Sequence, residues 1–542
     1  MQLHENEFTR LQDVVISFSK LSYSKCMSQK INNFTSSICA TNRENMESLQ
    51  LNIYKSLFEH KENTAFVCEG NSYSYLQFIE RITDIQNAYF NLPKVPTSIG
   101  IVANQDFDTY SAIIAALLSG ITYIPIETTH PDERNNHIIR SANIEIIFSS
   151  DSTDFSSDFL KKNSHKIIEI SLVKRNNGEL RIIPGNNPAY ILFTSGSTGI
   201  PKGVPISHEN LKTFSKNVKR MNLAISQQSK FLQVFDLTFD LSVFSFLIPL
   251  LHGASVYTLA KTPLRHTSAV QLIEEKEITH ILTVPSFVSF LKPYFRKIKL
   301  PSVQQWLFCG EALKTDLVSA WQQCVPSATI YNVYGPTEAT IFCTSYNCQD
   351  NNIKEYHGMV SIGKPFSDTE FVLLNNSQTE TGFNTTAELL IGGSQLTSGY
   401  LNDPEKNKSA FVTLNSKVYY RSGDVCQCNE NGDYFFIGRN DSQVKINGFR
   451  VEISELEYHS RLIPGVLECV VLASENKKNN QLQLNLLYSS ENQLTDEVIT
   501  GFLSQRVPPY MLPSRILFVS NIPYNVNGKI DKIKLTELLE QS

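Results

Sequence analysis

The feature that most constrains this 542-residue chain is a short apolar run that ends in a glycine-rich loop. Residues 190–203 read Tyr-Ile-Leu-Phe-Thr-Ser-Gly-Ser-Thr-Gly-Ile-Pro-Lys-Gly. The apolar residues Tyr190 to Phe193 predict a buried strand. The three glycines of the loop predict backbone N–H groups that can approach an anion closely.

This loop is a candidate site for a polyphosphate. Its hydroxyl side chains can donate hydrogen bonds to phosphate oxygens, and Lys202 adds a positive charge. It is not a Walker loop, because no Gly-Lys-Ser or Gly-Lys-Thr closes it. The alternative is a flexible surface linker, but linkers rarely follow a buried strand and rarely end in Pro-Lys-Gly.

The composition indicates a globular protein and excludes some partners. Hydrophobic residues make up 41% of the chain and the formal net charge is −5, so nothing indicates binding to nucleic acid or to a membrane surface. No apolar run approaches the ~18 residues of a spanning helix, and the N-terminus does not resemble a secretory signal. Cys426 and Cys428 have the wrong spacing for a zinc site, so we expect buried thiols in a cytoplasmic protein.

The pattern of apolar runs predicts an α/β fold with two folded parts. Residues 1–48 are polar, and their role as an N-terminal extension is unknown. Residues 49–440 alternate apolar runs with helical patterns, which predicts layered α/β sheets in a large core domain. Residues 441–542 predict a small α+β domain, in which the runs 467–473 and 481–488 form a hairpin.

Two further motifs suit a nucleotide. The first is Asn332-Val-Tyr-Gly-Pro-Thr-Glu338, in which the Gly-Pro turn projects the neighbouring side chains. Tyr334 can stack on a purine, and Asn332 can form hydrogen bonds to the edge of that purine. Glu338 is a hard oxygen ligand for the Mg²⁺ that accompanies ATP. In Tyr420-Arg-Ser-Gly-Asp424, the carboxylate can bind both ribose hydroxyls. Each alone has an ordinary reading, as a turn or cap residue.

A lysine near the C-terminus has the chemistry to assist attack on ATP. Lys529 lies in Asn527-Gly-Lys-Ile-Asp531, behind a flexible Asn-Gly turn. A lysine that bridges a substrate carboxylate and the α-phosphate offsets the repulsion between the two anions. Alone, such a lysine is nearly always a solvated turn residue.

Together, these motifs resemble the adenylate-forming superfamily, which includes acyl-CoA synthetases, luciferases and nonribosomal peptide synthetase adenylation domains. They follow the order of that family from residue 50 to the end of the chain. The resemblance implies that Lys529 is catalytic, that Glu338 holds the metal, and that Asp441 is the hinge of a mobile C-terminal lid. It implies that after hinge rotation residues 445–450 face the active site. The implied ATP-binding residues are Thr194, Ser195, Gly196, Ser197, Thr198, Lys202, Gly310, Glu311, Asn332, Tyr334, Gly335, Pro336, Thr337, Asp424 and Arg439.

The segment Phe239-Asp240-Leu-Ser-Val-Phe244 resembles the substrate pocket of members that activate amino acids, in which the aspartate pairs with the α-ammonium group. Burying a carboxylate without a cationic partner is costly, so Asp240 favours an α-amino acid. The alternative is an ordinary helix N-cap. The resemblance gives an apolar pocket for a small neutral or apolar side chain, formed by Leu241, Phe244, Thr283, Leu307, Cys309, Val333, Ile341 and Phe342, with Lys529 also reaching the substrate.

Two runs, Thr283-Val-Pro-Ser-Phe and Leu307-Phe-Cys-Gly-Glu-Ala, resemble the ligases that load D-alanine onto a carrier protein. In that family the cysteine at the position of Cys309 helps to select the D-enantiomer, so D-alanine is a leading candidate. No carrier motif follows residue 441, so the expected partner is a separate carrier protein with a phosphopantetheine arm. The rival functions are a CoA ligase for a carboxylic acid without an amino group and a non-catalytic scaffolding homologue.

Overall fold

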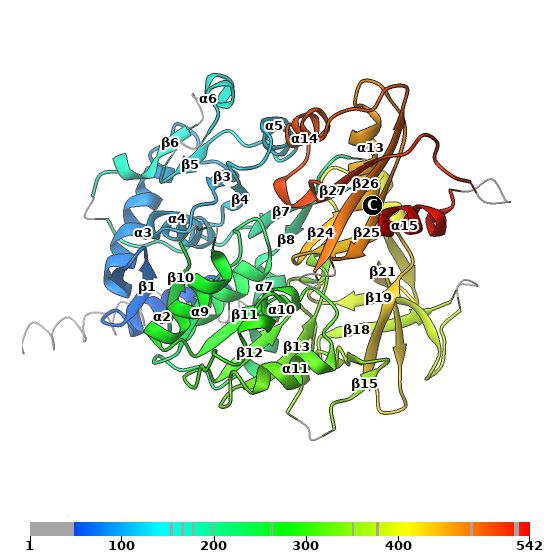
Figure 1. Cartoon of the computed structure of the whole chain (residues 1–542). Helices are drawn as coiled ribbons and strands as arrows, with labels where there is room; N and C mark the ends of the chain where they lie inside the picture. Colours follow the sequence, from blue (N-terminus) through cyan, green and yellow to red (C-terminus); the bar gives the residue numbers. More distant parts are fainter. Residues whose placement is uncertain are drawn as a thin grey trace, which may run out of the picture.

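The computed structural model describes residues 48–541 except 152–154, 164–166, 176–177, 197–198, 261, 263, 350–351, 376–378, 477–480 and 525–529. In Figure 1 the chain forms sheets covered by helices, and the C-terminal part packs on one side of the rest. None of the helices in the described part of the chain has both the length and the apolar character that crossing a bilayer requires.

The largest sheet has nine strands. Six central strands run parallel, and antiparallel strands flank them at both edges. In spatial order the strands are β17 (Lys364–Pro365), β14 (Thr344–Asn347), β13 (Thr329–Tyr334), β12 (Gln305–Phe308), β11 (His280–Thr283), β9 (Lys230–Gln233), β10 (Ser255–Thr258), β1 (Thr64–Cys68) and β2 (Asn71–Ser74).

A second sheet of six strands carries the glycine-rich loop. Five strands are parallel, and the last is antiparallel because the loop turns the chain straight back. The order is β6 (Ile167–Glu169), β5 (Ile147–Ser149), β3 (Ser98–Val102), β4 (Thr122–Ile126), β7 (Tyr190–Thr194) and β8 (Lys202–Ile206). The predicted buried strand before the loop is therefore β7, whose first three residues are buried.

Helices fill the space between these sheets and cover their outer faces. α4 packs on β3 and β4, α8 packs on β9 and β10, and Tyr110 and Phe246 join the two helices with ring centroids 5.6 Å apart. All residues of α8 are buried, as are the residues of α4 from Thr109 onward, and most side chains of both helices are apolar, as expected for helices in a core. Among the described residues before 411, the helices are α2 (Leu49–Glu59), α3 (Tyr75–Phe90), α4 (Phe107–Leu118), α5 (Asp132–Ser141), α6 (Ser157–Asn163), α7 (His208–Arg220), α8 (Leu241–Leu250), α9 (Arg265–Lys276), α10 (Pro285–Phe290), α11 (Thr315–Gln322) and α12 (Pro404–Ala410), with short 3-10 turns η3 (Ile170–Leu172), η4 (Lys292–Tyr294) and η5 (Thr337–Ala339).

An antiparallel sheet follows the nine-stranded one. It contains β18 (Thr369–Leu374), β19 (Thr386–Gly393), β21 (Lys417–Cys428) and β20 (Phe411–Leu414), with β22 (Tyr434–Arg439) paired to β21. The two short strands β15 (Glu355–Tyr356) and β16 (Met359–Val360) form a separate pair. Pairing of β21 with β22 places Asp424 opposite Arg439, which brings two predicted site residues together.

The chain beyond residue 441 forms a small α+β unit with its own apolar core. As predicted, two apolar runs form an antiparallel hairpin, and β27 then pairs parallel to β26. The elements are β23 (Gln443–Ile446), β24 (Phe449–Glu452), α13 (Ile453–Arg461), β25 (Val466–Glu475), β26 (Leu482–Ser490), α14 (Asp496–Ser504), η6 (Pro509–Met511), β27 (Arg515–Phe518) and α15 (Lys532–Gln541). The α/β fold class is confirmed, and the domain boundaries at residues 48 and 441 stay predictions.

Candidate active site

The glycine-rich loop leaves β7 and meets the C-terminal unit. The Ser195 hydroxyl donates to the backbone oxygen of Arg450 at 2.7 Å, and the Gly196 N–H donates to the Glu455 carboxylate at 3.1 Å. The buried Thr194 hydroxyl has no hydrogen-bond partner within the described structure. Ser197 and Thr198, two predicted phosphate-binding residues, lie outside the described residues.

Lys202, at the start of β8, is buried beneath this loop. Its side chain is 8% exposed, with the ammonium group 5.3 Å from the centre of the Tyr400 ring and 3.9 Å from the Glu452 carboxylate. Burial, together with the nearby Arg450 charge, lowers the pKa of Lys202 to about 8, although Glu452 and Glu338 oppose the change. A buried cation of this kind suits an anionic ligand.

Glu338, in η5, is fully buried and heavily hydrogen-bonded. Arg450 Nη1 lies 2.9 Å from each carboxylate oxygen, and the Tyr400 hydroxyl donates to Oε1 at 2.6 Å. Burial raises the pKa of this carboxyl, but Arg450, Tyr400 and Lys202 outweigh it, so the net pKa is lowered. Its hard oxygens fit Mg²⁺ chemically. Arg450 takes the place of the cation in this arrangement, and the described residues contain no cluster of three or more metal-ligating side chains.

Three predicted nucleotide-binding residues meet here: Tyr334 and Arg439, the last residues of β13 and β22, contact Asp424, which lies within β21. The Tyr334 hydroxyl donates to Asp424 Oδ2 at 2.5 Å, and Arg439 forms an ion pair with the same carboxylate. Arg439 Nε also donates to Asp441 Oδ1 at 2.8 Å. Burial raises the pKa of Asp441, but Arg439 outweighs it and holds the pKa below its usual value. The predicted hinge residue is thus tied to the predicted ribose-binding aspartate.

Two other predicted ATP-binding residues are committed to contacts within the protein. The Asn332 side chain donates to the backbone oxygen of Ser361 at 2.9 Å. The Glu311 carboxylate accepts from Ser286 N at 2.8 Å and from Gly448 N, in the β23–β24 turn, at 2.7 Å. Burial raises the pKa of Glu311, although these donors oppose the change. Glu311 therefore holds the turn of the C-terminal hairpin against the core.

Asp240 stands directly before α8 and lines a cavity together with the C-terminal hairpin. It occupies the N-cap position, but its side chain makes no capping hydrogen bond, so the helix-cap alternative does not account for it. The residue is 5% exposed. Burial raises the pKa of Asp240 to about 6, while the Thr337 hydroxyl and the Lys445 charge oppose this. The cavity is lined by Phe239, Asp240, Leu241, Cys309, Gly310, Gly335, Pro336, Thr337, Ile341, Asp424, Arg439, Gln443, Lys445, Gly448 and Arg450.

The structure brings only part of the predicted substrate pocket to this cavity. Leu241, Cys309 and Ile341 line it with Asp240. Burial raises the pKa of the Cys309 thiol to about 12, so the group is a neutral thiol. The other predicted residues are buried behind this wall: Phe244 and Phe342 contact each other with centroids 5.5 Å apart, and the Thr283 hydroxyl accepts a hydrogen bond from Trp306. Leu307 and Val333 are buried in β12 and β13.

The predicted catalytic Lys529 lies outside the described residues. The chain on either side of it belongs to the C-terminal unit, where Tyr524 and Ile530 form an isolated bridge and Asp531 N donates to the Pro523 oxygen at 2.8 Å. The hairpin that does face the cavity is β23–β24, the segment expected there after hinge rotation.

Sequence reasoning missed three residues that shape the site. Tyr400 binds Glu338, Arg134 pairs with Glu455 at 3.2 Å, and Glu455 accepts from the glycine-rich loop. Nothing local in the sequence marks the role of Tyr400. The contacts of Arg134 and Glu455 depend on how distant segments pack.

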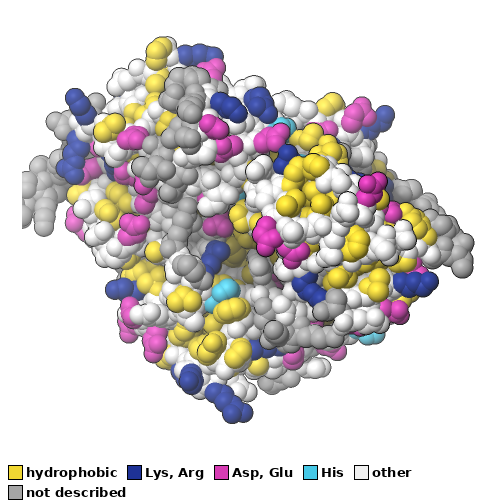
Figure 2. Space-filling view, turned by 45° about the horizontal axis from the view of Figure 1, so that its top comes forward, with side chains coloured by type: hydrophobic (Ala, Val, Ile, Leu, Met, Phe, Trp, Pro, Cys, Tyr) yellow, Lys and Arg dark blue, Asp and Glu magenta, His cyan; other side chains and the backbone are white. Residues whose placement is uncertain are grey.

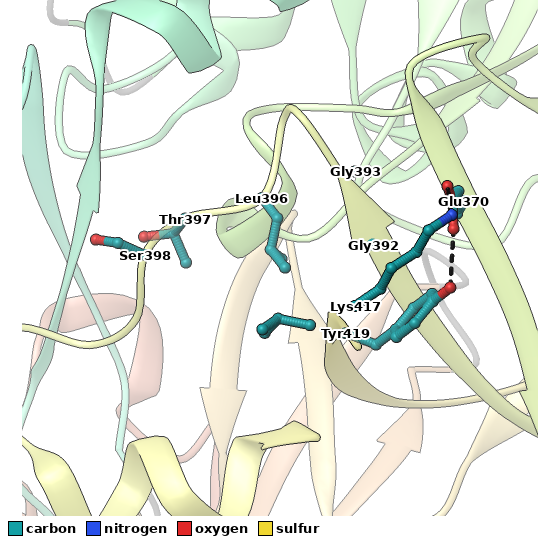
Figure 3. Close-up of a pocket in the computed structure, with 9 residues that line it drawn as sticks. Glu370, Gly392, Gly393, Leu396, Thr397, Ser398, Lys417 and Tyr419 are labelled. Carbon is teal, nitrogen blue, oxygen red and sulfur yellow. Dashed lines mark hydrogen bonds and ion pairs between the residues drawn. The ribbon is translucent and has the colours of Figure 1, made fainter. Parts of the chain in front are cut away.

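A second, larger cavity of about 420 Å³ lies over β18, β19 and β21. In Figure 3 the Tyr419 hydroxyl points to Glu370, with which it forms a 2.8 Å hydrogen bond, and Lys417 pairs with the same carboxylate. No predicted site residue lines this cavity. On the face seen in Figure 2, acidic and basic side chains are intermixed without a large patch of one sign.

Comparisons with known proteins found relatives of this chain in both sequence and structure. A family model described as AMP-binding enzyme matches residues 54–401. A D-alanine--D-alanyl carrier protein ligase of Bacillus licheniformis is 28% identical over 79% of this chain and 86% of its own length. Gramicidin S synthase 1 of Brevibacillus brevis is 30% identical over 88% of this chain but only 43% of its own length. The crystal structure of the Vibrio cholerae adenylation domain AlmE in complex with glycyl-adenosine-5'-phosphate superposes with a TM-score of 0.81, covering 92% of this chain and 99% of that one, at 24% identity.

Proposed function

The chain belongs to the family of AMP-binding enzymes, and we propose that it activates a small amino acid with ATP and hands it to a separate carrier protein. The enzyme class is an ATP-dependent, AMP-forming ligase. The single observation that carries the choice of an amino acid is Asp240, a buried carboxylate at a cavity wall without a capping role. The α-ammonium group of a bound amino acid supplies the cation that a buried carboxylate requires.

In the first half-reaction, an oxygen of the amino-acid carboxylate attacks the α-phosphate of ATP. A P–O bond forms to the carboxylate, the bond to the β-phosphate oxygen breaks, and pyrophosphate leaves. Thr194, Ser195 and Lys202 bind the phosphates, while Asp424 and Tyr334 hold the nucleoside. Lys529 stabilises the charge that develops between carboxylate and phosphate. Glu338 would hold Mg²⁺, which neutralises phosphate charge when bound.

In the second half-reaction, a pantetheine thiol attacks the acyl carbon, a C–S bond forms, the C–O bond to the phosphate breaks, AMP leaves, and the thiol proton is released to solvent. The arrangement of the structure suits this step better than the first. Arg450 forms an ion pair with Glu338, and the Ser195 hydroxyl of the loop donates a hydrogen bond to the C-terminal hairpin. Lys445, Gly448 and Arg450 of this hairpin line the cavity. The first half-reaction therefore requires that β23–β24 withdraw, and a hinge at Asp441 provides that motion.

The mostly apolar residues that line the cavity at Asp240 determine which amino-acid side chain the substrate can carry. Leu241, Cys309 and Ile341 surround Asp240, and Phe342 and Phe244 close the space behind them. Bulky rings and a neutral thiol leave room for a small side chain and give no partner to a charged one. Among small amino acids we favour D-alanine, because the relative from Bacillus licheniformis is named a ligase for it.

Trapping the adenylate with hydroxylamine tests this proposal. The enzyme is incubated with ATP, Mg²⁺ and either alanine or propionate, which differs from alanine only by lacking the amino group. We expect hydroxamate and AMP with one alanine enantiomer and none with propionate. Equal product from propionate would favour the rival CoA ligase, and no product from any acid would favour the scaffolding homologue.

A further inference from the structure

Helix α13 lies across the glycine-rich loop. Its residues Glu455, Tyr458 and His459 are spaced i, i+3 and i+4, so they share one face of the helix. At Gly199, where φ is +79°, an added Cβ would lie 2.8 Å from a ring carbon of Tyr458 and 3.5 Å from His459 Nε2. The helix face and the loop are therefore in direct contact.

Glu455 places a carboxylate at the point where the loop offers an N–H group. Its side chain is 1% exposed, and one oxygen accepts from Gly196 N at 3.1 Å while the other faces Arg134 Nη1 at 3.2 Å. Arg134 is itself 4% exposed, and its Nε has no partner within the described structure. Burial raises the pKa of Glu455, and Arg134 with the Gly196 N–H opposes this. A buried carboxylate held by a loop N–H and an arginine has the surroundings of a bound phosphate oxygen.

A second acid of the same unit, Glu452, faces Lys202, the cationic side chain of the loop. The Glu452 carboxylate lies 3.9 Å from Lys202 Nζ, and both side chains are buried. The two carboxylates thus face two groups, the Gly196 N–H and Lys202, that are suited to binding phosphate. A ligand phosphate and these carboxylates repel each other and compete for the same donors.

We propose that Glu455 is an internal anion that stands in for a phosphate oxygen at the loop, so that pyrophosphate and docked α13 exclude each other. This inference rests on the proposed function and assigns a positioning role to Glu455 within it. Departure of pyrophosphate frees the Gly196 N–H for Glu455, which favours the arrangement for the thiol-dependent step. Pyrophosphate that rebinds favours the undocked arrangement and slows that step.

The exclusion predicts how variants bind pyrophosphate. A ligand that binds only the undocked state is weakened by the fraction of protein that is docked, so loosening α13 tightens binding. Glu455→Gln keeps the shape of the side chain and removes its charge. Tyr458→Ala removes a ring that is 47% exposed, so its effect on folding is small. For both variants we expect magnesium pyrophosphate to bind about three- to tenfold more tightly than to the unaltered protein in calorimetry.

Glu457→Gln is the matched control on the same helix. Its carboxylate accepts from Val471 N at 3.1 Å, within the C-terminal unit and away from the loop, so the dissociation constant should not change. A second measurement is the rate of amide hydrogen exchange in α13. If Glu455 only stabilised the fold, pyrophosphate would not change that rate. Pyrophosphate should speed amide exchange in α13 of the unaltered protein. The increase should be smaller in Glu455→Gln, because the helix of that variant is already loosened.

Equal or weaker pyrophosphate binding by both Glu455→Gln and Tyr458→Ala would overturn the inference, as would unchanged exchange in α13. These outcomes are separable from a failure of the proposed function. Tighter binding without hydroxamate formation would support the internal anion and reject amino-acid activation. Normal hydroxamate formation with unchanged pyrophosphate affinity would support amino-acid activation and reject the internal anion.

Discussion

Replacing Asp240 by asparagine is predicted to stabilise the unliganded protein and to abolish amino-acid activation. Burial raises the pKa of this carboxyl from 3.8 to about 6. At about 1.4 kcal/mol per pKa unit, ionisation of Asp240 costs the folded state roughly 3 kcal/mol at neutral pH. The neutral amide removes that cost because it carries no charge to desolvate.

The sign of the pH dependence follows from the raised pKa. Since the folded-state value lies above the unfolded one, the cost is absent below about pH 4, grows as pH rises, and is complete above about pH 6. Chemical denaturation should show Asp240→Asn more stable than the unaltered protein by roughly 2–3 kcal/mol at pH 7.5, with most of the gain lost near pH 4. The matched control is Asp368→Asn, because Asp368 is a partly exposed carboxylate paired with Arg220, away from the cavity.

The same substitution leaves the substrate ammonium without a counter-charge. Hydroxamate formation should fall at least about a hundredfold, because breaking a buried ion pair costs roughly 3 kcal/mol or more. The reasoning is refuted if Asp240→Asn is no more stable at pH 7.5, or if it still activates the amino acid with near-normal efficiency.

Three further substitutions and conditions test other parts of the site. Lys529→Ala should abolish adenylation and leave the thermal unfolding midpoint unchanged; near-normal ATP–pyrophosphate exchange would remove the assigned role of this lysine. Gly448→Ala should lower the rate of aminoacyl transfer at least about tenfold and change the rate of ATP–pyrophosphate exchange less than about threefold. The reason is that φ of Gly448 is +84° and the new Cβ would lie 2.4 Å from Val284. Gly432→Ala, at φ +77° with nothing within 4 Å, is its control, and equal transfer by the two would contradict the hairpin's role. The KM for the amino acid should rise as pH falls below about 6, because protonated Asp240 cannot pair with the ammonium group, and a flat profile from pH 5 to 8 would count against that pairing.

Local pattern was enough to predict much of the fold. The apolar run before the glycine-rich loop is β7, and the two runs beyond residue 466 form the β25–β26 hairpin. Both follow from side-chain periodicity within short windows, which depends little on the rest of the chain. The motifs gave Tyr334 and Asp424 as two separate nucleotide-binding candidates, and neither motif could predict the hydrogen bond that joins them.

The contacts that fix the arrangement of the site could not be read from the sequence. Arg450 and Glu338 are 112 residues apart, and Glu455 and Gly196 are 259 residues apart. Such pairs form only when the C-terminal unit packs on the core, and no local pattern specifies that packing. For the same reason the sequence predicted Leu307 and Val333 to line the pocket, whereas both are buried in strands and neither lines the cavity.

ATP–pyrophosphate exchange with both enantiomers of the amino acids, in Mg²⁺ and without carrier protein, tests the central claim most directly. The account predicts strong exchange with one small amino acid, D-alanine first among them, and its loss in Asp240→Asn. The account would be contradicted if no amino acid supported ATP–pyrophosphate exchange but a carboxylic acid without an amino group did.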